Sequence, residues 1–219
     1  MQASTFEMLR IEHIHDIVLP SVETCLKPLG FETQGPLRWI RSTDAPIRQC
    51  FRLEQWKGGI LSPTWGLSLD FVPHLSGNQI KWHRAPKSAL PDLTFDPRDR
   101  SMEVSYMRGI DEVAQLVPSV MQEAVIQAGH FWESACSIDQ LPEVFAGVKR
   151  HLSSGGLGFY NFRQHPIAYA FVLAMNGHPD LAEAEFQKYT EGLPTTTRAK
   201  LREIFVAAGG RPNQYAAST

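Results

Sequence analysis

Asp70 and His74 have the types and spacing that acid–base chemistry requires. They lie four residues apart at the end of a predicted strand, and His83 falls on the next predicted strand. A carboxylate that orients an imidazole is the arrangement that general-base catalysis needs. Ser68 lies close by, but it lacks the G-x-S-x-G context of a serine nucleophile. If the protein is an enzyme, these three residues are the expected catalytic site; the simpler interpretation is a polar strand end that faces water.

Arginine and tryptophan side chains on neighbouring predicted strands form a second candidate site. Both residue types are favoured as anchors of protein interfaces. They also suit single-stranded nucleic acid, because arginine neutralises phosphate and tryptophan stacks on bases. The formal net charge of −2 opposes strong binding to a phosphate backbone, so another protein is the favoured partner. The residues expected on this face are Arg48, Arg52, Trp39 and Trp56.

Metal ligands and cofactor motifs are not predicted. His13 and His15 are flanked by carboxylates, but residues two apart on a helix point about 200° away from each other and do not grip one ion easily. The aspartates at 92, 96 and 99 do not match the spacing of a calcium loop. The glycine-rich run at 155–158 lacks a phosphate-binding pattern and is better explained as a linker. We therefore expect neither a metal nor another cofactor.

The elements that must position these residues begin with two alternating segments. The apolar side chains of 47–53, which are Ile47, Phe51 and Leu53, fall on odd positions, and the odd positions of 65–71 are all apolar. Alternation with a period of two indicates strands with one face on a core and one face toward water or a ligand. We expect the sheet to contain the segments 37–41, 47–56, 64–72, 80–83 and 102–107. A long loop at 84–100 should follow the fourth of these strands.

Helical periodicity appears on both sides of the sheet region. A first helix should be capped by Ser4 and Glu7, and either its continuation or a second helix from Pro20 should end at Gly30. Helices are also expected at 111–124 and 141–152, the latter behind a capping box of Ser137 and Gln140. Three short helices at 164–176, 179–191 and 196–208 include a helical hairpin. The predicted class is α+β: an antiparallel sheet of about five strands with flanking helices and a C-terminal helical subdomain. The predicted divisions are a sheet domain at 1–152, a hinge at 153–163, a helical subdomain at 164–210 and a flexible tail at 211–219.

Composition favours an ordinary globular chain. Hydrophobic residues make up 43% of the 219 positions and charged residues 20%. No apolar run approaches the ~20 residues that span a bilayer, and the first residues lack the pattern of a secretory signal. The three cysteines are isolated and odd in number, which argues against a disulfide framework. We expect a cytoplasmic protein without a membrane partner.

Four short runs are similar to those of a known family. They are Leu26-Lys27-Pro28-Leu29-Gly30-Phe31, Trp39-Ile40-Arg41, Phe51-Arg52-Leu53-Glu54 and Trp65-Gly66-Leu67-Ser68-Leu69. Over residues 15–150 or so, the chain resembles the bacterial domain-of-unknown-function family 4304. The resemblance implies an α+β sheet with flanking helices. It implies no activity and supplies no catalytic residues.

Three functions are compatible with these patterns. The favoured one is a non-enzymatic module that binds another protein, such as an adaptor or an immunity-like protein, since no complete catalytic constellation is present. The alternative is a hydrolase or a small-molecule-binding protein that uses Asp70, His74 and His83 in a cleft beneath the C-terminal helices. A weak binder of single-stranded nucleic acid is the third.

Overall fold

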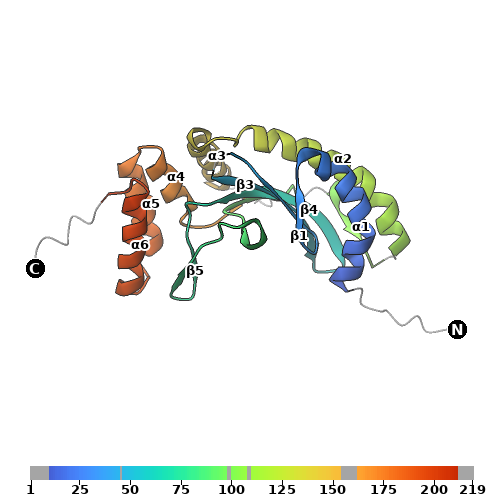
Figure 1. The fold of residues 1–219 in the computed structure, drawn as a ribbon, viewed down its shortest axis with the longest axis horizontal. Helices are drawn as coiled ribbons and strands as arrows, with labels where there is room; N and C mark the ends of the chain where they lie inside the picture. The colour runs from blue at the N-terminus through green and yellow to red at the C-terminus, as the bar shows by residue number, and fades with distance from the viewer. Residues whose placement is uncertain (1–9, 45, 98–99, 108–109, 154–161, 212–219) are drawn as a thin grey trace, which may run out of the picture.

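A seven-stranded antiparallel sheet organises the molecule (Figure 1). The computed structural model describes residues 10–44, 46–97, 100–107, 110–153 and 162–211. The sheet runs in the order β1-β2-β3-β4-β7-β9, and β8 pairs with β4 beside this path. The predicted α+β class is confirmed. The strands are β1 (Glu32–Gly35), β2 (Arg38–Ser42), β3 (Ile47–Trp56), β4 (Ile60–Leu69), β7 (Leu93–Phe95), β8 (Val104–Ser105) and β9 (Phe162–Gln164).

The long pair β3 and β4 forms the centre of the sheet. Its register places Phe51 opposite Trp65 and Ile47 opposite Leu69. All four of these side chains are at most 2% exposed. The alternation seen in the sequence therefore gives one continuous apolar face, as predicted, because successive side chains of a strand point to opposite sides.

Two helices cover this apolar face (Figure 1): α1 (Ile11–Leu26) and α2 (Ile110–Glu133). The buried residues of α1 recur every four positions, at Ile14, Val18, Val22 and Leu26. This spacing produces one apolar stripe on a helix, which packs on the sheet. The predicted cap at Ser4 and Glu7 lies outside the described residues.

The C-terminal helices share the hydrophobic core of the sheet. They are α4 (Ala168–Met175), α5 (Pro179–Thr190) and α6 (Thr195–Ala207), and they follow α3 (Leu141–Ser153). Six of the eight residues of α4 are buried, and its apolar side chains belong to the same cluster as Phe51 and Trp65. The predicted hinge and tail fall mostly on residues 154–161 and 212–219, outside the described residues, so the domain division stays a prediction.

The second face of the central sheet is more covered than the sequence suggested. We expected its side chains to stay available to water, but Ser62, Thr64 and Ser68 are each at most 2% exposed. Cys50 joins Ile40 and Ala89 in a small separate apolar cluster there. Ala89 belongs to the segment after β6, which therefore covers Ile40 and Cys50. The expectation of an open face is wrong for these positions and for the buried serine and threonine side chains.

The expected loop at 84–100 contains ordered elements, and one predicted strand lies elsewhere. β5 (His74–Ser76) and β6 (Gln79–Lys81) form a separate two-stranded hairpin instead of extending the main sheet. The loop region contains the short helix η2 (Pro86–Ser88) and strand β7. Short strands of three residues carry little periodic signal, which explains why β5, β7 and β9 were missed. Across the described residues, no helix has both the length and the hydropathy needed to cross a membrane.

Candidate functional site

Three histidines and one buried aspartate meet where the C-terminal segment joins the sheet. His74 begins β5, His83 follows β6, Asp92 precedes β7 and His165 follows β9 directly. We call these four residues the His–Asp cluster. His74 and His83 come from the region of the β5–β6 hairpin, Asp92 from the segment before β7 and His165 from the segment after β9, so only the folded protein brings all four together.

Asp92 is the member of the cluster that hydrogen bonds hold most firmly. Its backbone N–H donates to the carbonyl of Leu67 and its carbonyl accepts from the N–H of His165, both at 2.7 Å. The carboxylate is 1% exposed: Oδ2 accepts from the N–H of Leu69 at 2.7 Å, and Oδ1 lies 2.8 Å from Nε2 of His74. Burial raises the pKa of Asp92, and the hydrogen bond from His74 opposes that rise. The hydrogen bond between Asp92 and His74 therefore lies in a buried site of low polarity.

His165 stacks on the ring of His74. The two rings stack with their centroids 4.1 Å apart and their planes 24° apart, and Tyr189 from α5 lies 6.2 Å from His165. Burial, followed by the nearby charges of His74 and His83, lowers the pKa of His165 to about 4. The ring is therefore neutral at pH 7, with a lone pair on one nitrogen. Its Nδ1 is buried and has no hydrogen-bond partner among the described residues.

His83 contacts the ring of His74. Its ring meets that of His74 edge-on, with the centroids 4.7 Å apart and the planes at 78°. Nδ1 lies 2.8 Å from the carbonyl oxygen of Ser88, which can only accept a hydrogen bond. Burial, and then the charge of His74, lowers the pKa of His83. The Ser88 carbonyl fixes the tautomer of His83: Nδ1 carries the proton and Nε2 carries the lone pair.

Three members of the cluster have the geometry of a metal-ligand set. Potential ligand atoms of His74, Asp92 and His165 all lie within 4.8 Å of one another. Two imidazoles and one carboxylate are common protein ligands of zinc and related ions. The same groups also resemble an acid–base pair, in which Asp92 orients His74.

The predicted catalytic trio is brought together only in part. His74 and His83 are neighbours, but the carboxylate of Asp70 forms a two-pronged ion pair with Arg48, including a 2.9 Å bond from Nη2 to Oδ2. Asp92 occupies the position beside His74 that we expected for Asp70.

The predicted arginine and tryptophan face does not form one exposed surface. Trp39 is 1% exposed and packs edge-on against Phe51, so its ring belongs to the core. Arg48 is committed to its ion pair, and its side chain is 12% exposed. Arg52 is partly buried, and Trp56, at 36%, is the most exposed of the four. Strand register explains the difference: Trp39 faces Phe51 on the core side of β2.

Sequence reasoning missed Asp92 and His165 as site residues. It considered Asp92 only as a calcium ligand, although a single acidic residue between Leu90 and Leu93 is itself a sign of a buried carboxylate that needs a partner. His165 carries no comparable local signal. Its neighbour in space, His74, is distant in the sequence, and only the pairing of β9 with β7 brings the two together.

His13 and His15 of α1 are not grouped with further metal-ligating side chains in the part of the chain that the structure describes. His13 is exposed, whereas Nδ1 of His15 accepts a hydrogen bond from the backbone N–H of Leu37 at 3.2 Å. Nδ1 of His15 is thereby occupied in holding the start of β2 against the helix.

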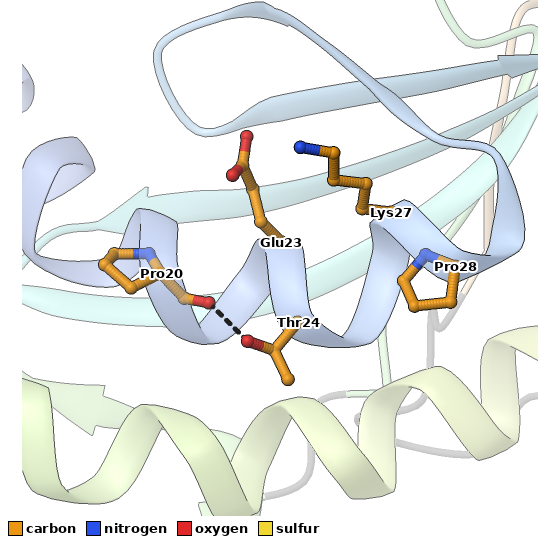
Figure 2. A pocket seen from close by; sticks show the side chains of 5 residues that line it. All are labelled: Pro20, Glu23, Thr24, Lys27 and Pro28. Atoms are coloured by element: carbon orange, nitrogen blue, oxygen red, sulfur yellow. Dashed lines mark hydrogen bonds between the residues drawn. The ribbon is translucent and has the colours of Figure 1, made fainter.

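A depression on the outer side of α1, with a volume of 480 Å³, lacks comparable chemistry (Figure 2). It is lined by Pro20, Glu23, Thr24, Lys27 and Pro28, and all but Glu23 are exposed. The hydroxyl of Thr24 donates to the carbonyl of Pro20 at 2.8 Å, which satisfies both groups within the helix. Figure 2 shows Glu23 and Lys27 on the same side of α1. Opposite charges on an open helix surface do not by themselves make a site.

Comparisons of this chain with protein-family models, curated proteins and solved structures gave no match. The resemblance to domain-of-unknown-function family 4304 therefore stays a prediction. Functional inference has to proceed from the geometry of the His–Asp cluster.

Proposed function

We propose that the protein binds a divalent transition-metal ion through His74, Asp92 and His165. The observation that supports this most directly is the approach of their ligand atoms to within 4.8 Å of one another. This proposal departs from the sequence-based expectation of no metal, which considered Asp92 only as a calcium ligand and did not include His165.

The distances are close to those of a metal-bound set. Zinc–nitrogen bonds of about 2.0–2.1 Å put neighbouring ligand atoms of a tetrahedral site about 3.4 Å apart. The 2.8 Å contact between His74 and Asp92 would open by roughly half an ångström, and the widest separation would close by about 1.4 Å. Rotation of side chains can provide such shifts without moving the backbone of Asp92, which two hydrogen bonds of 2.7 Å hold to Leu67 and His165.

The charge state of the cluster also suits a cation. A metal ligand must be deprotonated, and the low pKa of His165 keeps its ring neutral at pH 7. An ion would supply the partner that the buried Nδ1 atom lacks among the described residues. It would also favour the ionised form of Asp92, which burial otherwise disfavours.

A second candidate function is acid–base catalysis by the pair of His74 and Asp92. The 2.8 Å contact and the burial of Asp92 support it, because a buried carboxylate sets the tautomer of the imidazole that it touches. This is the hydrolase alternative of the sequence, with Asp92 in place of Asp70. The protein-binding hypothesis draws less support from the geometry, since Trp39 is buried and Arg48 is paired.

Calorimetric titration tests the proposed function. Chain stripped of metal with a chelator is titrated with Zn²⁺ and with Co²⁺ at pH 7.5. We expect one ion to bind per chain, and His165→Ala to weaken binding at least tenfold, since loss of even an outer-shell partner costs about 10–100-fold. The matched control is His13→Ala, which removes an exposed histidine of α1 and should leave the affinity unchanged.

Circular dichroism and the unfolding midpoint of each variant without metal establish that it is folded. Failure of the wild-type chain to bind either ion would overturn the proposal. Equal losses in His165→Ala and His13→Ala would overturn it as well, because the binding would then be nonspecific.

A further inference from the structure

We infer that His83 is the fourth ligand of the same ion, so that three imidazoles and one carboxylate surround it. This inference rests on the proposed metal-binding function and goes beyond the compact set of three ligands. It assigns His83 a direct bond through Nε2.

The hydrogen bond of His83 leaves the correct nitrogen available. The 2.8 Å contact with the carbonyl of Ser88 requires the proton on Nδ1, so Nε2 presents its lone pair. A metal-bound histidine almost always donates its other N–H to a carboxylate, a backbone carbonyl or water, and His83 already has this second contact. The Ser88 carbonyl is held in a short turn, since the N–H of Ser88 donates to Ala85 at 2.9 Å. The tautomer of His83 is therefore set before any ion arrives.

The spacing of the rings fits a common ion. A zinc–nitrogen bond of about 2.1 Å places the centre of a ligating imidazole roughly 3.2 Å from the ion, so two rings of a tetrahedral site have centres about 5 Å apart. His74 has neighbours on two sides, with His83 at 4.7 Å and His165 at 4.1 Å between ring centroids. Each of these two ring pairs would need to spread by an ångström or less to reach the separation found in a tetrahedral site.

Contacts of Arg84 hold the backbone next to His83, whereas the side chain of His83 can still turn. The guanidinium of Arg84 lies 3.6 Å from the ring of Trp82, and its Nε donates to the carbonyl of Asp70 at 2.9 Å. These contacts hold the chain next to His83 against the end of β4. His83 itself is only half-buried, so its ring has room to turn toward the other ligands.

The completed ligand set selects a class of ion. Three imidazole nitrogens and one carboxylate oxygen suit Zn²⁺ or Co²⁺, whereas Mg²⁺ and Ca²⁺ prefer sites made of oxygen. A site with four protein ligands is closed, which is typical of structural rather than catalytic zinc. The ion would join the β5–β6 hairpin, the start of β7 and the segment that leads into α4.

Cobalt spectroscopy and nuclear magnetic resonance on the full chain test this inference. Visible absorption of the Co²⁺-loaded wild type should show the intense bands of a four-coordinate site. In His83→Ala we expect an affinity at least tenfold lower and altered bands, because a solvent molecule replaces an imidazole. His13→Ala should reproduce the wild type. In the Zn²⁺-loaded wild type, nitrogen-15 shifts should show His83 with Nε2 bound to the metal and the proton on Nδ1.

The outcomes separate the two proposals. If the wild type binds neither ion, the proposed function fails and this inference fails with it. If the wild type binds and His83→Ala keeps both the affinity and the spectrum, only the inference is overturned. A weaker affinity with unchanged bands would also overturn it, since His83 would then position another ligand without touching the ion. The resonance measurement uses the wild type, so it decides the matter even if His83→Ala does not fold.

Discussion

Acid should destabilise the metal-free protein through His165. Its pKa falls from the ordinary 6.5 to about 4 on folding, so between these values the unfolded chain binds a proton that the folded chain does not. The sign follows: stability contributed by the neutral ring is complete above pH 6.5 and is lost as the pH falls toward 4. At about 1.4 kcal/mol per pKa unit, the contribution of the neutral ring to the free energy of unfolding is at most about 3 kcal/mol. Solvent around the half-buried ring reduces this contribution to about 1–2 kcal/mol.

Urea unfolding at pH 7 and at pH 4.5, with a chelator present, measures this quantity. The comparison is with His165→Phe, which keeps an aromatic ring against His74 but cannot titrate. The lowered pKa of His83 acts in the same direction, and the raised pKa of Asp92 acts in the opposite direction. Both groups remain in the variant, so the difference between the two proteins reports on His165 and on its repulsion with the other histidines. We expect the wild type to lose about 1–2 kcal/mol more than the variant on acidification. An equal loss in both proteins would refute the reasoning.

Two further predictions, which use three substitutions, test how the sheet positions the site. Gly66→Ala should lower the free energy of unfolding by several kcal/mol, because a Cβ at this position would collide with the backbone carbonyl of Leu93 on β7. Gly129→Ala in α2 is the control: a Cβ there meets nothing within 4 Å, so the free energy of unfolding should stay unchanged or rise by about 0.5–1 kcal/mol. Similar unfolding midpoints for the two variants would contradict this close approach of β7. Arg48→Ala should lower the free energy of unfolding by about 1–3 kcal/mol, since Asp70 is left partly buried without its main partner. An unchanged free energy of unfolding of Arg48→Ala in urea would show that the ion pair does not stabilise the protein.

The sequence predicts the sheet and its main helices because their signals are local. Alternation around Phe51 and the four-residue spacing from Ile14 to Leu26 each depend on a short window of chain. The capping box at Ser137 is also present, with Gln140 accepting from the backbone N–H of Ser137 at 3.3 Å. Elements of this kind are readable without knowledge of the tertiary structure.

The site was predicted only in part because its decisive contacts are long-range. His74 and His83 belong to one hairpin region, and their proximity follows from a short turn between β5 and β6. Asp92 and His165 join them through strand pairings that have no signature in the local sequence. Trp39, by contrast, was predicted to belong to a binding surface to which it does not belong. Its type suggested a surface anchor, whereas the register of β2 with β3 places it in the core.

Anomalous X-ray scattering at the zinc absorption edge, from crystals of the Zn²⁺-loaded chain, tests the central claim most directly. The structure predicts a single strong peak about 2.1 Å from ligand atoms of His74, Asp92 and His165. A peak at His13 or elsewhere on the surface, or none near Asp92, would contradict a metal site in the His–Asp cluster.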